Sequence, residues 1–333
     1  MNRKQVVLLL AHGTPETVEQ IPEYLLKVTG GRPLPAAVVE EIQHRYSLIG
    51  HSPLTEITHE QGRLVEAELA ADGLPVPVYV GMRNWTPYIG DVVRRMRADG
   101  VEEVAVICLA PHNSRTSVGL YRRAVEAEAE GLQIDFIEGW AQHPLLIEAF
   151  AERLKQAFEK LSAETGGPVP VLFTAHSVPC RTVQTAQSAP ASADDGSRTG
   201  GPPALAPDPY AEEAKRTAAL VADRIPEIPQ WWFAFQSQGA SGGPWIGPTV
   251  EETLDAVAAT GVRTLLLHPI GFLCDHVEIL YDVDIHFRAH AAKLGVRLER
   301  PESLNNSVLL AHAVADLARK GLQRLRNADG HTS

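Results

Sequence analysis

The sequence predicts an α/β fold made of two similar doubly wound, Rossmann-like domains with parallel sheets around a central cleft. Short, nearly continuous apolar runs alternate with longer amphipathic stretches, as in parallel sheets covered by helices on both faces. The two halves also repeat motifs in the same order. AHGTP at 11–15 is echoed by AHSVP at 175–179, and APH at 110–112 is echoed by HPIGFLCDH at 268–276.

The predicted elements follow from these patterns in chain order. Strands are expected at the apolar runs 5–11, 77–82, 103–109, 133–138, 169–174, 231–236 and 263–269. Helices are expected between them, at 58–71, 86–99, 115–130, 143–160, 249–260 and 304–325. Thr14 and Pro15 are typical of the N-cap and first turn of a helix. The repeat divides the chain into domains at 1–145 and 146–330, and we expect the C-terminal helix to pack back on the N-terminal domain.

The segment 181–207 differs in composition from the rest of the chain. It is rich in Ser, Ala, Pro, Gly and Thr and has almost no large apolar side chains. Such a segment cannot bury a face, so we predict a flexible insertion. Two interpretations remain open, a tolerated surface insertion or a cover over the cleft, since the segment begins close to His176.

Composition limits the function classes. The chain has 333 residues, 44% of them hydrophobic, and a net charge of −11, which argues against nucleic acid or an anionic membrane as partner. No stretch is long enough to span a bilayer. Three scattered cysteines form no CxxC pair, so we expect free thiols in a cytoplasmic protein and no four-cysteine iron–sulfur cluster. Nothing in the sequence indicates an obligate oligomer, and we expect a monomer.

A file of polar side chains follows the last predicted strand. Glu278, Asp282 and His286 recur at four-residue steps, which places them along one side of a helix. Like charges at this spacing destabilise a helix, and the file begins near a strand end, where open α/β sheets bind ligands. Oxygen and nitrogen ligands suit a divalent cation such as iron(II). A network of structural charges is the competing interpretation.

Common catalytic motifs are missing from the sequence. It contains no GxGxxG after a strand, no GxxxxGK[ST], no HExxH and no GxSxG, so nucleotide and several hydrolase chemistries lose support. The remaining polar features are histidines at strand ends. His12 and His176 end equivalent strands and are expected to face the same cleft, and His112 follows the third strand.

Several longer stretches carry a resemblance to a known family. They include LLAHGTPE (9–16), RYSLIGHSPL (45–54), GMRNWTPYI (81–89), LAPHNSRTSVGLY (109–121), TAHSVP (174–179), PWIGPTVEE (244–252) and HPIGFLCDHVEILYDVD (268–284). In this order the chain resembles the ferrochelatases, lyases that insert iron(II) into a porphyrin in haem synthesis. The stretch RYSLIGHSPL resembles the coproporphyrin III branch of that family.

The resemblance implies roles for particular residues. His176 and Glu278 would be catalytic, and the metal would meet both of them together with Asp282 and His286. The porphyrin would be bound by His12, Arg45, Tyr46, Ser52 and Tyr121. His12 stands where relatives often have Tyr. It is therefore expected to bind the product iron, to take part in proton or metal transfer, or only to cap the helix predicted at Pro15.

The resemblance also implies substrates and partners. Iron(II) and coproporphyrin III would be substrates, Fe-coproporphyrin III the product, and no permanent cofactor would be needed. Downstream haem-synthesis enzymes would be potential partners. The alternative enzyme uses protoporphyrin IX or inserts cobalt on the same scaffold, and the alternative from another class is a two-domain porphyrin-binding protein without chemistry.

Overall fold

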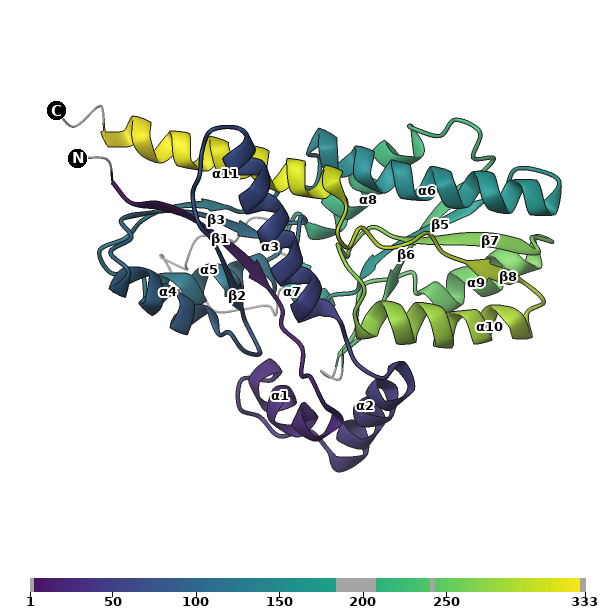
Figure 1. Ribbon diagram of the computed structural model, residues 1–333. Coiled ribbons are helices and arrows are strands. Elements are labelled where there is room, and N and C mark those ends of the chain that lie inside the picture. Colours follow the sequence, from purple (N-terminus) through teal and green to yellow (C-terminus); the bar gives the residue numbers. More distant parts are fainter. Residues whose placement is uncertain (1–2, 184–207, 240–242, 330–333) are drawn as a thin grey trace, which may run out of the picture.

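The computed structural model describes residues 3–183, 208–239 and 243–329 (Figure 1). It contains two four-stranded parallel sheets with the same strand order, β2-β1-β3-β4 and β6-β5-β7-β8. The first sheet comprises β1 (Gln5–Ala11), β2 (Val78–Met82), β3 (Glu103–Cys108) and β4 (Gln133–Ile137). The second comprises β5 (Val171–His176), β6 (Trp231–Gln236), β7 (Thr264–Pro269) and β8 (Arg297–Glu299). The predicted α/β class with two parallel sheets is confirmed.

Strand β1 shows why the apolar runs form buried strands. Val7 and Leu9 pack into the large core shared by the two halves, whereas Val6 and Leu8 pack into a second cluster on the opposite face. Alternate residues of a strand point to opposite faces of the sheet, so a strand covered on both sides must be apolar at every position. Strand β3 is likewise buried along its whole length.

Helices cover both faces of each sheet. They are α3 (Leu54–Ala71), α4 (Ile89–Ala98), α5 (Val118–Glu126), α6 (Pro144–Thr165), α8 (Tyr210–Ala222), α9 (Val250–Ala259), α10 (Arg288–Lys293) and α11 (Val308–Asp329). The last helix, α11, lies against α3, β3 and β4 and also against α6, and it runs along one edge of the molecule across the first half (Figure 1). The domain boundary predicted at 145/146 falls within α6 and stays a prediction.

Two helices absent from the predicted elements form a small lobe. Helices α1 (Ile21–Val28) and α2 (Ala36–Ile49) lie apart from both sheets in Figure 1. Their apolar cluster contains Tyr24, Tyr46 and Trp85, and α2 contacts the segment that follows β7. This lobe therefore joins the first half to the predicted polar file.

The helix predicted at Thr14 and Pro15 is wrong. Both residues lie in irregular chain, and the short 3₁₀-helix η1 begins later, at Val18. The hydroxyl of Thr14 is 3.0 Å from that of Tyr46, so its side chain connects the end of β1 to α2 instead of capping a helix. Side-chain oxygens of this kind serve either purpose, and the tertiary contact decides which.

The segment after β7 is helical, but not as an α-helix. Residues Glu278–Phe287 form the π-helix η3, whose hydrogen bonds join residues five positions apart. Helix α10 continues directly from it. π-helices are rare and occur frequently at functional sites.

The predicted insertion at 181–207 lies mostly outside the described residues. Its first three residues end the short helix α7 (Cys180–Val183), and 184–207 are not described. Across the described parts of the chain, every helix is too short or too polar to cross a lipid bilayer.

Candidate active site

A cavity of about 350 Å³ lies where the carboxyl ends of the two sheets meet. Strand β1 ends at Ala11 and β5 ends at His176, so His12 and His176 leave the two sheets at equivalent positions and both line the cavity. Parallel α/β sheets bind ligands at this edge because the loops there carry polar groups beyond the ends of apolar strands. The expected shared cleft is therefore present in the structure.

Two glycines allow chain segments to pack closely beside these histidines. Gly13 has a φ of +83°, and a Cβ there would lie 2.9 Å from the backbone nitrogen of Trp85. A Cβ on Gly271 would lie 2.8 Å from the Cα of Ala175. Both positions need a residue without a side chain, which explains the glycine in AHGTP and in HPIGFL.

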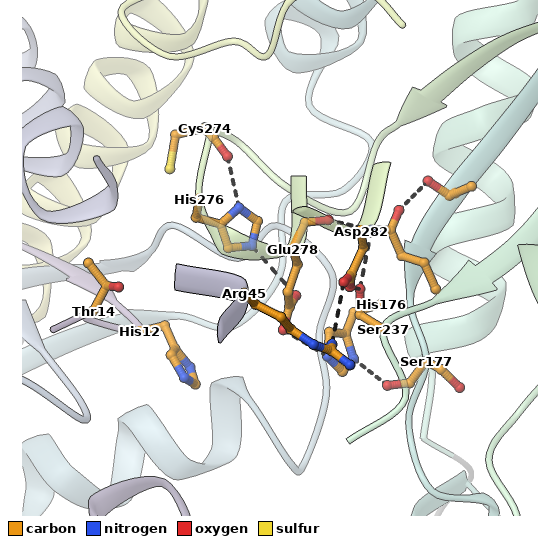
Figure 2. Close-up of polar contacts among 12 residues, drawn as sticks. His12, Thr14, Arg45, His176, Ser177, Ser237, Cys274, His276, Glu278 and Asp282 are labelled. Carbon is orange, nitrogen blue, oxygen red and sulfur yellow. Dashed lines mark hydrogen bonds and ion pairs between the residues drawn. The ribbon is translucent and has the colours of Figure 1, made fainter. Parts of the chain in front are cut away.

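His176 is held by its backbone and by one ring nitrogen. Its carbonyl accepts a hydrogen bond of 2.8 Å from the Tyr210 hydroxyl, and its Nδ1 bonds the carbonyl oxygen of Ser177. Since a carbonyl can only accept, Nδ1 carries a proton, and Nε2 is left facing Oε1 of Glu278 at 3.4 Å (Figure 2).

Glu278 lies between two histidines. Its second oxygen, Oε2, is 3.5 Å from Nε2 of His276. Burial favours the neutral carboxylic acid, but the two imidazoles outweigh it and hold the pKa of Glu278 well below its usual value. Burial lowers the pKa of His176, but Glu278, the Ser177 carbonyl and the charge of Asp282 together raise it more, so the net shift is upward. The pair thus favours a carboxylate beside an imidazolium, and His176 becomes a neutral proton acceptor only above its raised pKa.

His12 has a different environment on the other side of the cavity. Its exposed ring lines the cavity (Figure 2). The side-chain amide of Asn84 lies 3.0 Å from its Nε2. Desolvation by the surrounding protein lowers the pKa of His12. The negative charge of Glu278 raises this pKa in part, and the positive charge of Arg83 lowers it further. We conclude that His12 is neutral near pH 7 and keeps a lone pair.

Three further predicted porphyrin-binding residues line the same cavity. Tyr46 and Tyr121 are almost fully buried, and burial raises the pKa of both, to about 12 for Tyr46, so their hydroxyls stay protonated donors. The buried hydroxyl of Ser52 has no hydrogen-bond partner among the described residues. A buried hydroxyl without a partner is costly, which favours a ligand group at this point.

Arg45 lies elsewhere. It lines a second cavity of about 330 Å³, together with Asp282 and His286. Its guanidinium is 3.0 Å from Glu41 and 3.6 Å from Asp282, and it lies over the ring of Tyr281. The structure therefore places Arg45 against the polar file and outside the lining of the large cavity.

The polar file extends from one cavity to the other. Glu278 lines the large cavity, and Asp282 in the second cavity accepts a hydrogen bond of 2.5 Å from Ser237. Burial, reinforced by the charge of Glu278, raises the pKa of Asp282. His286 lies further out, 3.1 Å from Glu251 on α9, which raises its pKa.

The predicted metal residues do not form one closed site. Within residues 3–183, 208–239 and 243–329, no group of three or more His, Cys, Asp or Glu side chains is arranged to hold a metal ion. Of the four, His176 pairs with Glu278, His286 pairs with Glu251, a residue outside the predicted set, and Asp282 lines the second cavity with His286. Such an arrangement suits a cation that moves through better than one that stays.

A sequence model of the family described as Ferrochelatase matches residues 4–322. The chain belongs to the ferrochelatase family. A protein named Ferrochelatase from Acidobacterium capsulatum is 58% identical over 330 residues, which cover 99% of this chain and 98% of the relative. A coproporphyrin III ferrochelatase from Mycolicibacterium vanbaalenii is 33% identical and aligns with 94% of this chain and 88% of its own.

Solved structures show the same fold at low identity. The sirohydrochlorin chelatase from Bacillus subtilis subspecies spizizenii, in complex with cobalt, has a TM-score of 0.53 and 11% identity, covering 95% of this chain and 94% of its own. At such identity the likeness concerns the fold alone.

Two residues of this ferrochelatase-family site were missed by sequence reasoning. His276 was noted only as part of the internal repeat, although it contacts Glu278, and Arg83 lay within a quoted motif without a role. The Asp-His pair directly before the polar file was the available signal for His276. For Arg83 the only signal was its place just after a strand end, because its direction into the cavity depends on the turn that follows β2.

Proposed function

We propose that this chain inserts iron(II) into coproporphyrin III and releases Fe-coproporphyrin III, as a step of haem synthesis. The observation that carries the proposal is the His176–Glu278 pair, 3.4 Å apart on the wall of a cavity that His12 also lines. A flat macrocycle bound there would offer its pyrrole nitrogens to this pair. Iron(II) and the porphyrin are substrates in this proposal, and no permanent cofactor takes part.

The pair suits the proton chemistry of metal insertion. A free-base porphyrin loses its pyrrole N–H protons as the divalent ion enters. Nε2 of a neutral His176 accepts one proton, because Nδ1 is already committed to the Ser177 carbonyl. Glu278 stabilises the resulting imidazolium and offers an oxygen to the cation. Its contact with His276 provides a route by which the second proton leaves.

The second cavity supplies a route for iron. Hydrated iron(II) would meet His286 and Glu251 first, then Asp282, and finally Glu278. Each site offers few ligands, so water is exchanged stepwise and the ion is not trapped. Arg45 beside Asp282 balances the negative charge of this route when no cation is present.

The choice of coproporphyrin III rests on the propionate-binding groups and on relatives. Coproporphyrin III carries more propionates than protoporphyrin IX, and the cavity presents the Tyr46 and Tyr121 hydroxyls, the unpartnered Ser52 hydroxyl and the guanidinium of Arg83. Proteins named coproporphyrin III ferrochelatase are 30–33% identical to this chain over more than nine-tenths of it. Arginine and hydroxyl donors are suited to carboxylates.

The deciding experiment is anaerobic iron insertion with both porphyrins under the same conditions. We expect a higher kcat/KM for coproporphyrin III than for protoporphyrin IX. The reverse order would support the protoporphyrin enzyme. Tight binding of a porphyrin without insertion of iron or cobalt would support the porphyrin-binding protein, and the His176→Ala variant serves as the control without the proposed base.

A further inference from the structure

A partly buried ionic network connects two segments that flank the active site. Arg300, in the segment between β8 and α11, binds both oxygens of Asp284 through Nε and Nη2, each at 2.8 Å. The same guanidinium reaches Asp275 at 3.2 Å. The side chain of Arg300 is only 13% exposed, so this fork is shielded from competing water.

The two carboxylates belong to the two segments that carry the active-site contacts of Glu278. Asp284 lies in the middle of the π-helix that begins at Glu278, and Asp275 directly precedes His276. Arg300 therefore connects the helix that carries the carboxylate to the loop that carries its imidazole partner. The contact between these two segments joins Oε2 of Glu278 to Nε2 of His276, at 3.5 Å.

Asn305 extends the network to the cavity wall. Its side chain donates to Asp275 at 2.9 Å and accepts from the backbone N–H of the same residue at 2.8 Å. Its carbonyl accepts a hydrogen bond of 2.8 Å from Gln61, a buried residue of α3 that lines the large cavity. Asn305 has a φ of +43°, a left-handed conformation that asparagine tolerates better than most residues. Asn305 therefore connects the loop that carries His276 to helix α3 through hydrogen bonds.

We propose that Arg300 is a positioning residue for metal insertion, which sets the π-helix against the loop of His276 so that Glu278 stays between its two imidazole partners. The inference rests on the proposed function. It assigns to Arg300 no contact with porphyrin or iron. Fork geometry matters more than charge here, because only a guanidinium binds both oxygens of Asp284 and still reaches Asp275.

The test compares Arg300→Lys with a matched substitution. Arg324 on α11 makes a fork of the same geometry with Asp135 on β4 of the first sheet, at 2.8 and 2.7 Å; its side chain is more exposed, at 55%, and neither residue lines the large cavity. We expect Arg300→Lys to lower kcat at saturating iron by on the order of 10- to 100-fold, since small displacements near reacting groups cost this much. The KM for porphyrin should change little, and Arg324→Lys should keep the wild-type kcat.

A double variant separates positioning from a general loss of stability. If Arg300 acts through the contact of His276 with Glu278, then Arg300→Lys should cost less than about 3-fold in a His276→Ala background, because coupled residues are not additive. Hydrogen exchange of the unliganded protein gives a readout without turnover. Amides of 275–287 should exchange faster in Arg300→Lys and at the wild-type rate in Arg324→Lys.

Several outcomes would overturn the proposal. Equal losses of kcat in Arg300→Lys and Arg324→Lys would do so, as would full additivity with His276→Ala. Should Arg300→Lys fail to fold, Asp284→Asn removes the same fork at its other end and should lower kcat in the same way, and a normal kcat in that variant would exclude the role. Wild-type turnover tests the proposed function separately, so absence of insertion by the wild type is distinguished from a wrong assignment of Arg300.

Discussion

The ends of strands β1 and β5 occupy equivalent positions in two sheets of the same order, yet they present different chemistry. His176 after β5 faces a carboxylate at 3.4 Å, whereas His12 after β1 faces the neutral amide of Asn84. The charge of Glu278 raises the pKa of His176, while the surrounding protein lowers that of His12. The same cavity is therefore lined by one imidazole with a raised pKa and one imidazole with a lowered pKa.

The difference originates in the segments that follow β3 and β7. After β7 the chain forms the π-helix with Glu278 at its start, but after β3 it carries His112, which is buried and bonded to Thr217. The first half therefore contributes no carboxylate comparable to Glu278 in the large cavity's lining, as far as the described residues show. The comparison teaches that the sheet places the histidines and that the neighbouring segment sets their protonation.

The largest expected effect concerns the β5 end. His176→Ala should lower kcat for iron insertion by on the order of 100- to 10,000-fold, because a positioned proton acceptor contributes this much. Initial rates at saturating iron, with circular dichroism to establish folding, measure it. His290→Ala, an outer histidine paired with Asp255, is the control. Near-normal turnover by His176→Ala would remove the proposed asymmetry between the two strand ends.

The next effect concerns the carboxylate itself. Glu278→Gln keeps the shape but loses the charge, and we expect a severe loss of kcat. Because Glu278 raises the pKa of His176, the neutral base is abundant only above that raised pKa, and activity should fall as the pH drops through it. In the Gln variant this acidic limb should move to lower pH. Rate profiles between about pH 5 and 8 test the shift, and an unmoved limb would contradict the assignment of His176.

A smaller effect is expected along the polar file. Asp282→Asn and His286→Gln should raise the KM for iron by on the order of 10-fold, equivalent to the loss of one favourable contact, and should lower kcat less. Iron titrations at saturating porphyrin separate the two parameters. Equal loss of activity at saturating and limiting iron would indicate a structural role for these residues.

The β1 end should affect product binding more than turnover. A neutral imidazole is a good ligand for haem iron, so product bound to the wild type should show the absorption and resonance spectra of nitrogen-ligated iron. His12→Ala should lose these spectra, and it should turn over somewhat faster if release limits the rate. Identical spectra for the two proteins would eliminate the ligand role and leave His12 as a structural residue.

The last effect concerns stability rather than activity, and it arises at the end of β3. Burial lowers the pKa of His112 to about 4, so the unfolded chain binds a proton that the folded protein excludes between that pH and the ordinary value near 6.5. The stabilisation is complete above about pH 6.5 and is lost by about 1.4 kcal/mol per pH unit below it. His112→Gln should unfold with a correspondingly weaker pH dependence in urea titrations. An unchanged slope would show that His112 is protonated in the folded protein.

Periodicity was sufficient for seven of the eight strands in the two described sheets. The run QVVLLLA predicted β1 with the observed bounds because a strand buried on both faces must be apolar at every position. The same pattern missed β8, which is only three residues long, and the lobe of α1 and α2, whose apolar residues pack on Trp85 from a distant part of the chain. Short or peripheral elements take their stability from such contacts, which leave little periodic signal.

The site was predicted in part for the same reason. The spacing of Glu278, Asp282 and His286 indicated a polar file, and the repeat indicated that His12 and His176 share a cleft. The location of Arg45, the π-helical turns of the file and the contact of His276 with Glu278 were decided by tertiary structure. The sequence by itself determined which residues are polar and where strands end, because those depend on local patterns. Only the folded chain decided which groups stand within 4 Å of one another, because a pKa or an ion pair depends on distances between segments far apart in sequence.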